Sequence, residues 1–312
     1  MQSRSVVIES APAGRVASVA VDPPLPIEVA GLAVAVAPVA ALLMAFRRAD
    51  AARPEPKREV FATMALGFAA CVPAAALEVA EKRLLGSWAL AGGRFLDAYL
   101  VAALTEEGAK LLVVLAWPWR RGFDEVMDGI LFTAAASLGF GLLENLIYVD
   151  VRFASLFCAV PGIDALCTEH GAAGTLEGVV LGVVRAVTAV PMHAVASGIM
   201  GYYLGRARFH DWSPAADAFD DLPELLPAWV PRRVAWALFG LAAAVAVHGT
   251  YDWAVFAMGT RPVIFLVLPT MLLVSGYALT RLMRHALVID DERLGPRHAA
   301  PPTGTHTAPG GP

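Results

Sequence analysis

Charged residues are scarce in this chain of 312 residues. They make up 17% of it, against about 25% in an average soluble domain. Lysine is scarcer still, with Lys57, Lys82 and Lys110 as the full set. The net charge of −4 provides no basic surface of the kind that binds nucleic acid, so we expect no nucleic-acid partner. The first 26 residues are polar and lack the apolar stretch of about 7–15 residues that a signal peptide requires.

Hydrophobic residues, in contrast, make up 57% of the chain, and the mean hydropathy is +0.60. Seven apolar runs approach the length of about 20 residues that a helix needs to cross a bilayer. They are Val29 to Phe46, Val60 to Leu77, Ala98 to Trp119, Gly129 to Val149, Val179 to Gly205, Val234 to Met258, and Val263 to Leu279. In lipid each run must be helical, because no water satisfies the backbone there. The fold class is therefore an all-α, polytopic membrane bundle of about seven transmembrane helices, in the cell membrane.

The runs also predict how the chain is divided. Residues 1–26 form a polar tail, residues 27–289 the membrane domain, and residues 290–312 a disordered tail rich in Pro, Gly, Thr and His. The fifth run has 27 residues and contains Pro191. It is either one long, kinked helix or a helix with a break.

The connecting loops alternate in their content of Lys and Arg. Thirteen of these residues follow the first, third, fifth and seventh runs, and five lie in the other loops. The positive-inside rule then predicts an outer N-terminus and a cytoplasmic C-terminus. The loop with Cys158 and Cys167 would lie outside, where the two cysteines either form a disulfide or remain free thiols. Cys71, in an apolar run, is expected to pack as a small hydrophobe.

The third run carries three charges, Glu106, Glu107 and Lys110. A charge at the bilayer centre costs about 2.5–3.5 kcal/mol on insertion scales, so such residues usually have a function. On a helix, Lys110 lies within one turn of both acids and can pair with either. One acid would then pair with Lys110 and leave the other for acid–base chemistry. The alternative is an ion pair that closes a contact between helices.

Three other runs carry polar residues of the same kind. Glu144 is the one charged residue of the fourth run. His193 follows Arg185 in the fifth run, and His248 and Asp252 share a helical face in the sixth. Counted at 1.5 Å per residue, Glu106, Glu144 and His248 all lie in the outer half of the bilayer, whereas His193 is expected about 21 Å deep. The alternative to a catalytic function is, for each group, a structural hydrogen bond between helices or a position near the membrane surface.

Four motifs, in this order, carry a resemblance to a known family. They are Glu-Glu-x-x-Lys at 106–110, Phe-x-x-x-Glu-Asn-x-x-Tyr at 140–148, an Arg followed by Pro-x-His at 185–193, and His-x-x-x-Asp at 248–252. Over residues 95–260 the chain resembles the PrsW family of intramembrane proteases. The resemblance implies a peptidase that cuts a membrane-anchored protein, with anti-sigma factors as the substrate type, and it leaves open whether the enzyme is glutamic or metal-dependent.

Peptide hydrolysis requires an activated water, an oxyanion stabiliser and a proton for the leaving amine. We expect Glu106 or Glu107 to be the base, with Glu144 and His193 positioning the water or protonating the amine. His248 and Asn145 would stabilise the oxyanion. The supporting residues are Lys110, which would set the charge of the acids, Asp252, which would orient His248, and Arg185.

The cofactor prediction is either none or a divalent metal such as zinc. The sequence contains no His-Glu-x-x-His motif, so zinc ligands would come from separate helices. His193, His248 and Glu144 would then be the ligands, with Glu106 as the base. We favour the version without a metal.

Two other functions fit some of these residues. Buried Glu, Lys, Arg and His also form the proton relays of transporters, but we find no internal repeat of the kind that many transporters show. A non-catalytic membrane scaffold is the third reading. It predicts that changing Glu106, Glu107 or Glu144 to Gln has no effect.

Overall fold

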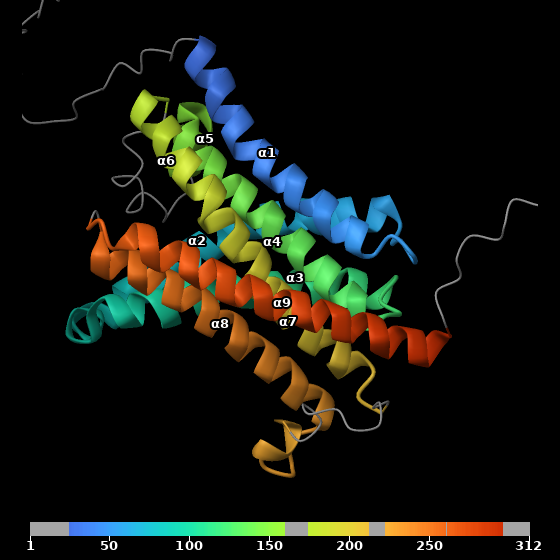
Figure 1. Ribbon diagram of the computed structural model, residues 1–312. Helices are drawn as coiled ribbons and strands as arrows, with labels where there is room; N and C mark the ends of the chain where they lie inside the picture. Colours follow the sequence, from blue (N-terminus) through green and yellow to red (C-terminus); the bar gives the residue numbers. More distant parts are fainter. Residues whose placement is uncertain (1–24, 160–173, 212–221, 260, 296–312) are drawn as a thin grey trace, which may run out of the picture.

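The structure is a computed structural model that describes residues 25–159, 174–211, 222–259 and 261–295, and Figure 1 shows the helices in these ranges. The described part contains no strand. The longer helices are α1 (Leu25–Ala49), α2 (Lys57–Leu96), α3 (Leu104–Ala116), α4 (Val126–Val149), α6 (Leu176–Val187), α7 (Ala189–Arg208), α8 (Arg232–Met258) and α9 (Ile264–Leu294). The shorter ones are the π-helix η1 (Asp97–Ala103), the 3₁₀ helices η2 (Pro118–Arg120) and η4 (Leu222–Leu225), and α5 (Val151–Cys158). The predicted all-α class is confirmed.

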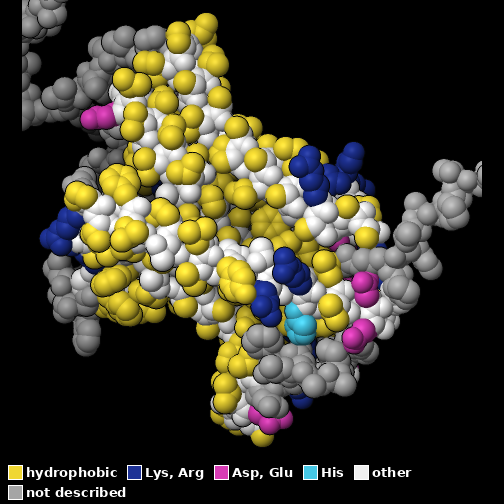
Figure 2. Space-filling view, viewed as in Figure 1, with side chains coloured by type: hydrophobic (Ala, Val, Ile, Leu, Met, Phe, Trp, Pro, Cys, Tyr) yellow, Lys and Arg dark blue, Asp and Glu magenta, His cyan; other side chains and the backbone are white. Residues whose placement is uncertain are grey.

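Helix α4 is the centre of the bundle. It is apolar around its whole circumference, as expected for a helix surrounded by others, and it contacts α1, α2, α6, α7 and α9. In the most apolar stretch of α4, 94% of the residues are buried inside the protein, whereas in the corresponding stretch of α9 only 11% are buried. Helices α1, α6 and α9 leave many large hydrophobic side chains exposed, and the face in Figure 2 is covered largely by hydrophobic side chains. This distribution suits a protein whose outer surface is in contact with lipid.

Helices α4 and α7 approach each other closely at two glycines. A Cβ atom on Gly129 would lie 2.1 Å from the carbonyl oxygen of Gly201, and one on Gly201 would lie 2.2 Å from the oxygen of Gly129. Small residues allow this backbone contact, which is typical of helix packing in membranes. The contact fixes α7, and with it His193, against α4.

Six helical segments are long and apolar enough to cross a membrane, in the part of the chain that the structure describes. The expected third run, from Ala98 to Trp119, is not among them: it is formed by η1, α3 and η2. Gly93, shortly before it, has a φ of 54°, in the left-handed region that glycine adopts without strain. The following η1 and α3 pack back against α2. The charged run is thus a partly π-helical segment enclosed by other helices.

The structure selects one of the two alternatives for the fifth run and moves one predicted boundary. The fifth run is broken, with α6 ending at Val187 and α7 starting at Ala189, because Thr188 has φ −123° and ψ −66° and Pro191 has no N–H for the carbonyl one turn before it. The last run was predicted to end at Leu279 and the membrane domain at residue 289, but α9 continues to Leu294, and Asp290 in this extension is buried and accepts hydrogen bonds from the first N–H groups of α4. The remainder of both tails and Cys167 lie outside the described residues, while Cys158 is disulfide-bonded, the first of the two predicted alternatives.

The described parts of the four more basic connections lie at one end of the bundle. Arg53 donates hydrogen bonds to Glu125 and to the carbonyl oxygen of Asp290. Arg293 donates to the carbonyl oxygen of Asp124 and stacks on the ring of Phe209. The alternation in Lys and Arg content therefore matches the arrangement of the chain, while the assignment of this end to the cytoplasm stays a prediction.

Candidate active site

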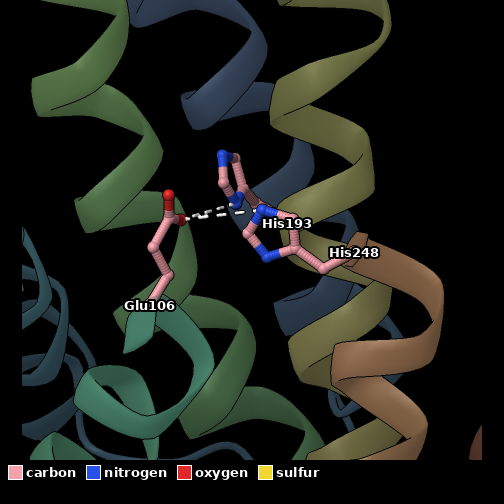
Figure 3. A group of neighbouring side chains, drawn as sticks. All are labelled: Glu106, His193 and His248. Atoms are coloured by element: carbon pink, nitrogen blue, oxygen red, sulfur yellow. Dashed lines mark ion pairs between the residues drawn. The ribbon is translucent and has the colours of Figure 1, made fainter. Parts of the chain in front are cut away.

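Three of the predicted side chains, each from a different helix, meet inside the bundle. Glu106 on α3 points toward the rings of His193 on α7 and His248 on α8, as Figure 3 shows. One ligand atom of each lies within 4.8 Å of the others. All three residues are buried. His193, which the residue count placed too deep for the site, belongs to it.

The two adjacent acids have different surroundings. Glu107 is fully buried, and Lys110 donates a hydrogen bond of 2.7 Å to its Oε1. The same oxygen lies 2.9 Å from Nδ1 of His248, and its Oε2 accepts a 2.6 Å hydrogen bond from Oγ of Ser197. Every oxygen of Glu107 is therefore occupied by a partner within the bundle.

Glu106, in contrast, has one close partner and faces a cavity. Its Oε2 lies 3.3 Å from Nζ of Lys110, 3.8 Å from Nδ1 of His193 and 3.7 Å from Nε2 of His248. It also lines a cavity of about 680 Å³. The two acids point in different directions from the helix, as their separation of 100° predicts, and Glu106 is the one that a substrate could reach.

Each histidine also faces a second carboxylate. Nε2 of His193 lies 2.7 Å from Oε2 of Glu144, and Nδ1 of His248 lies 2.9 Å from Glu107. Nε2 of His248 is 3.2 Å from Oδ2 of Asp252, as the i, i+4 spacing predicted. Because Lys110 can only donate, Nδ1 of His193 accepts its 3.1 Å hydrogen bond, so the proton of a neutral His193 ring lies on Nε2 and faces Glu144.

Arg185 completes the group from α6. Its Nε donates a 3.0 Å hydrogen bond to Oδ1 of Asn145, and its Nη2 lies 3.5 Å from Oε2 of Glu144. The guanidinium stacks over the ring of Tyr148 at 4.1 Å. Nη2 of Arg185 and Nδ2 of Asn145 are buried without a hydrogen-bond partner. Buried polar groups are normally satisfied, so these two donors are available to a bound substrate or water.

The cavity beside these groups is mainly apolar. Its polar residues next to the site are Glu106, Glu144, Arg185 and Asp252. Its apolar walls include Cys71, Phe140, Ile147, Leu181, Phe265 and Leu268. Cys71 is a buried free thiol, as expected of a small hydrophobe. A cavity with an apolar wall and a few polar groups at one end can hold a peptide with hydrophobic side chains.

The structure also adds residues that the sequence did not indicate. Ser197 lies one helical turn after His193, a spacing that could have pointed to it. Tyr99 belongs to η1, and π-helices often occur at functional sites. Its hydroxyl is 2.7 Å from Oγ1 of Thr250 on α8. Phe140, part of the second motif, places its ring 4.6 Å from Nζ of Lys110, where it stabilises the ammonium by a cation–π contact.

Comparisons with known proteins fit this arrangement. A family model described as "PrsW family intramembrane metalloprotease" matches residues 55–277. The chain belongs to the PrsW family. "Protease PrsW" of Bacillus subtilis (strain 168) is 30% identical over 79% of this chain and 91% of its own length. The protein of that name from Geobacillus kaustophilus (strain HTA426) is 30% identical over 71% of this chain and 78% of its own length. No solved structure matches the chain.

Membership of the PrsW family confirms the predicted peptidase class and the multi-pass membrane location. All nine predicted site residues lie in one connected group, which extends over α3, α4, α6, α7 and α8.

The family description raises the question whether the site suits a metal. Glu106, His193 and His248 provide one carboxylate and two imidazoles, a donor set typical of catalytic zinc. The second nitrogen of each histidine faces a carboxylate, Glu144 or Glu107, the usual arrangement around metal-bound histidine. The residues therefore fit a divalent ion. The sequence predicted His193, His248 and Glu144 as the metal ligands. In the structure the carboxylate that converges with the two histidines is that of Glu106, not Glu144.

Proposed function

We propose that this PrsW-family peptidase hydrolyses a peptide bond of a membrane-anchored protein inside the bilayer, with an anti-sigma-factor-like protein as the substrate type. The observation that supports this most directly is Glu106. Its carboxylate lies at the polar end of an apolar cavity, within 4 Å of both buried histidines. A transmembrane segment, unwound at the scissile bond, would place apolar side chains along the cavity walls and the reacting carbonyl at Glu106.

In this proposal Glu106, His193 and His248 hold a divalent metal ion, and Glu107 and Ser197 position His248. A bound ion would polarise the substrate carbonyl and make water more acidic. Glu144, which lines the cavity and contacts Nε2 of His193, takes the proton from the attacking water and passes it to the leaving amine.

Arg185 then has a role in catalysis. As water attacks the carbonyl carbon, negative charge develops on the carbonyl oxygen, and the C–N bond breaks when the amine receives the proton. In this proposal Arg185, which lines the cavity, donates a hydrogen bond from Nη2 to the substrate near this oxygen, and Asn145 holds the guanidinium by accepting from its Nε. Such preorganised donors are usually the largest contribution to rate in acyl transfer, and the loss of one lowers kcat by about 10²–10³-fold.

One observation favours the metal-free version instead. Nζ of Lys110 contacts both Oε2 of Glu106 and Nδ1 of His193, the two atoms that a metal would use. If the ammonium keeps this position, Glu106 itself is the base and His248 donates to the oxyanion. Metal analysis of the purified, detergent-solubilised protein decides between the versions: stoichiometric zinc, with activity lost to a chelator and restored by zinc, selects the metal version.

The function is tested with Glu106→Gln and Glu144→Gln, with Glu292→Gln on the exposed surface of α9 as the matched control. Comparative proteomics of membrane-anchored proteins identifies substrates as those that are cut in cells with the wild type and intact in cells with Glu106→Gln. We expect both site variants to insert normally and to lose cleavage by at least about 10²-fold, and the control to cleave normally. Normal cleavage by Glu106→Gln would overturn the proposal.

A further inference from the structure

A second group of acids lies at the opposite end of α4 from Glu144. Glu55 comes from the loop between α1 and α2, Asp124 from the loop before α4, and Asp128 from the first turn of α4. One carboxylate oxygen of each lies within 4.8 Å of the others. Asp128 and Glu144 are 16 positions apart on α4, so this group is about 24 Å along the helix from the active site.

Asp128 gives this group a fixed, buried ligand atom. The residue is fully buried, and its Oδ2 accepts hydrogen bonds of 2.8 and 2.7 Å from the backbone N–H groups of Asp124 and Glu125. Its Oδ1 is buried without a hydrogen-bond partner and belongs to a carboxylate directed at the other two acids. The carboxyl group that it faces is that of Glu55, and two facing carboxyl groups that are partly buried are satisfied either by a shared proton or by a bound cation.

The neighbouring cations are bound elsewhere. Arg53 pairs with Glu125 and Asp291, and Arg293 pairs with Asp290 and binds the backbone of Asp124. Within the described ranges, no Lys or Arg forms an ion pair with the side chain of Glu55, Asp124 or Asp128. Three carboxylates thus lie close together without a compensating positive charge.

We propose that Glu55, Asp124 and Asp128 form a binding site for a divalent cation of the Mg²⁺, Ca²⁺ or Mn²⁺ class. Carboxylate oxygens are the ligands that these hard cations prefer. Asp124 is exposed and Glu55 half-buried, so water from solvent can complete the coordination. The bound ion connects the α1–α2 loop to the start of α4, and it stabilises the end of the helix that carries Glu144 at its other end.

Mn²⁺ is the probe for this site, because its free and bound forms differ in electron paramagnetic resonance. Full-length, detergent-solubilised wild type is titrated beside Glu55→Gln, Asp124→Asn and Asp128→Asn. An asparagine at 128 can still accept both backbone hydrogen bonds, and Glu55→Gln does not touch the helix cap. Glu292→Gln is again the control.

We expect the wild type and the control to bind one more Mn²⁺ than each site variant, or to bind it at least about tenfold more tightly. His193→Ala should still bind Mn²⁺ at Glu55, Asp124 and Asp128. This variant therefore distinguishes the ion at these acids from any ion at the active site, and the test of the cation site from the test of the proposed peptidase function. Equal Mn²⁺ stoichiometry and affinity in the wild type, Glu55→Gln and Asp124→Asn would overturn the proposal; this is also the result expected if the three carboxylates share a proton.

Discussion

Two fully buried serines in the bundle core permit a sharp test of the active-site geometry. Oγ of Ser197 donates a 2.6 Å hydrogen bond to the buried carboxylate of Glu107, whereas Oγ of Ser137 has no hydrogen-bond partner. Both side chains are 0% exposed, and both become alanine with the loss of one oxygen. The pair therefore differs mainly in the contact with Glu107.

Ser197→Ala should be clearly destabilising. A hydrogen bond to a charged group contributes about 1.5–3 kcal/mol, and its loss leaves a buried carboxylate oxygen unsatisfied. Because Glu107 also holds Nδ1 of His248, the variant should lower activity and metal affinity by about 10–100-fold, as changes behind a metal-bound histidine usually do. Ser137→Ala removes an unsatisfied hydroxyl and should change the free energy of unfolding by less than about 0.5 kcal/mol.

Thermal melting in detergent measures the stability of both variants, and cleavage of a tagged membrane substrate measures their activity. We expect a melting temperature several degrees lower for Ser197→Ala and an unchanged one for Ser137→Ala. If Ser197→Ala melts and cleaves like the wild type, the hydrogen bond does not position Glu107, and the division of roles between the two acids is wrong.

Other predictions concern packing, capping and metal. Gly249→Ala would place a Cβ atom 2.5 Å from the ring of Tyr99, so it should lower the free energy of unfolding by about 1–3 kcal/mol. Gly276 has open space around the position of a Cβ atom, so Gly276→Ala should leave the melting temperature unchanged or raise it slightly. Asp290 accepts hydrogen bonds from two N–H groups at the start of α4, so Asp290→Ala should lower the free energy of unfolding by about 1–2 kcal/mol. The side chain of Asp291 is half-exposed, so Asp291→Ala should lower it by less than about 0.5 kcal/mol. Treatment with a chelator should lower both the melting temperature and the cleavage rate, and zinc should restore the cleavage rate, if the metal version of the mechanism holds.

The sequence by itself determined the helical class and the location of the site. Apolar runs in lipid have no alternative to helix, so the places of the helices along the chain could be predicted, although α2 and α9 extend well beyond their predicted runs. Charges are costly in such runs, which made Glu106, Glu144, His193 and His248 stand out. Contacts within one helix followed from its 3.6-residue period: Lys110 bonds to both acids and His248 meets Asp252, as predicted.

The tertiary structure alone decided which groups meet across helices. The rotation of α3 about its axis depends on all its neighbours, and it is this rotation that directs Glu106 to the cavity and encloses Glu107. The break at Thr188 and the contact of Ser197 likewise depend on how α7 packs on α4. The acids Glu55, Asp124 and Asp128 lie in different segments, and only the return of the chain to the same end of the bundle brings them together. Such contacts between distant residues leave no periodic pattern in the sequence, because they are set by packing and not by the geometry of a single helix.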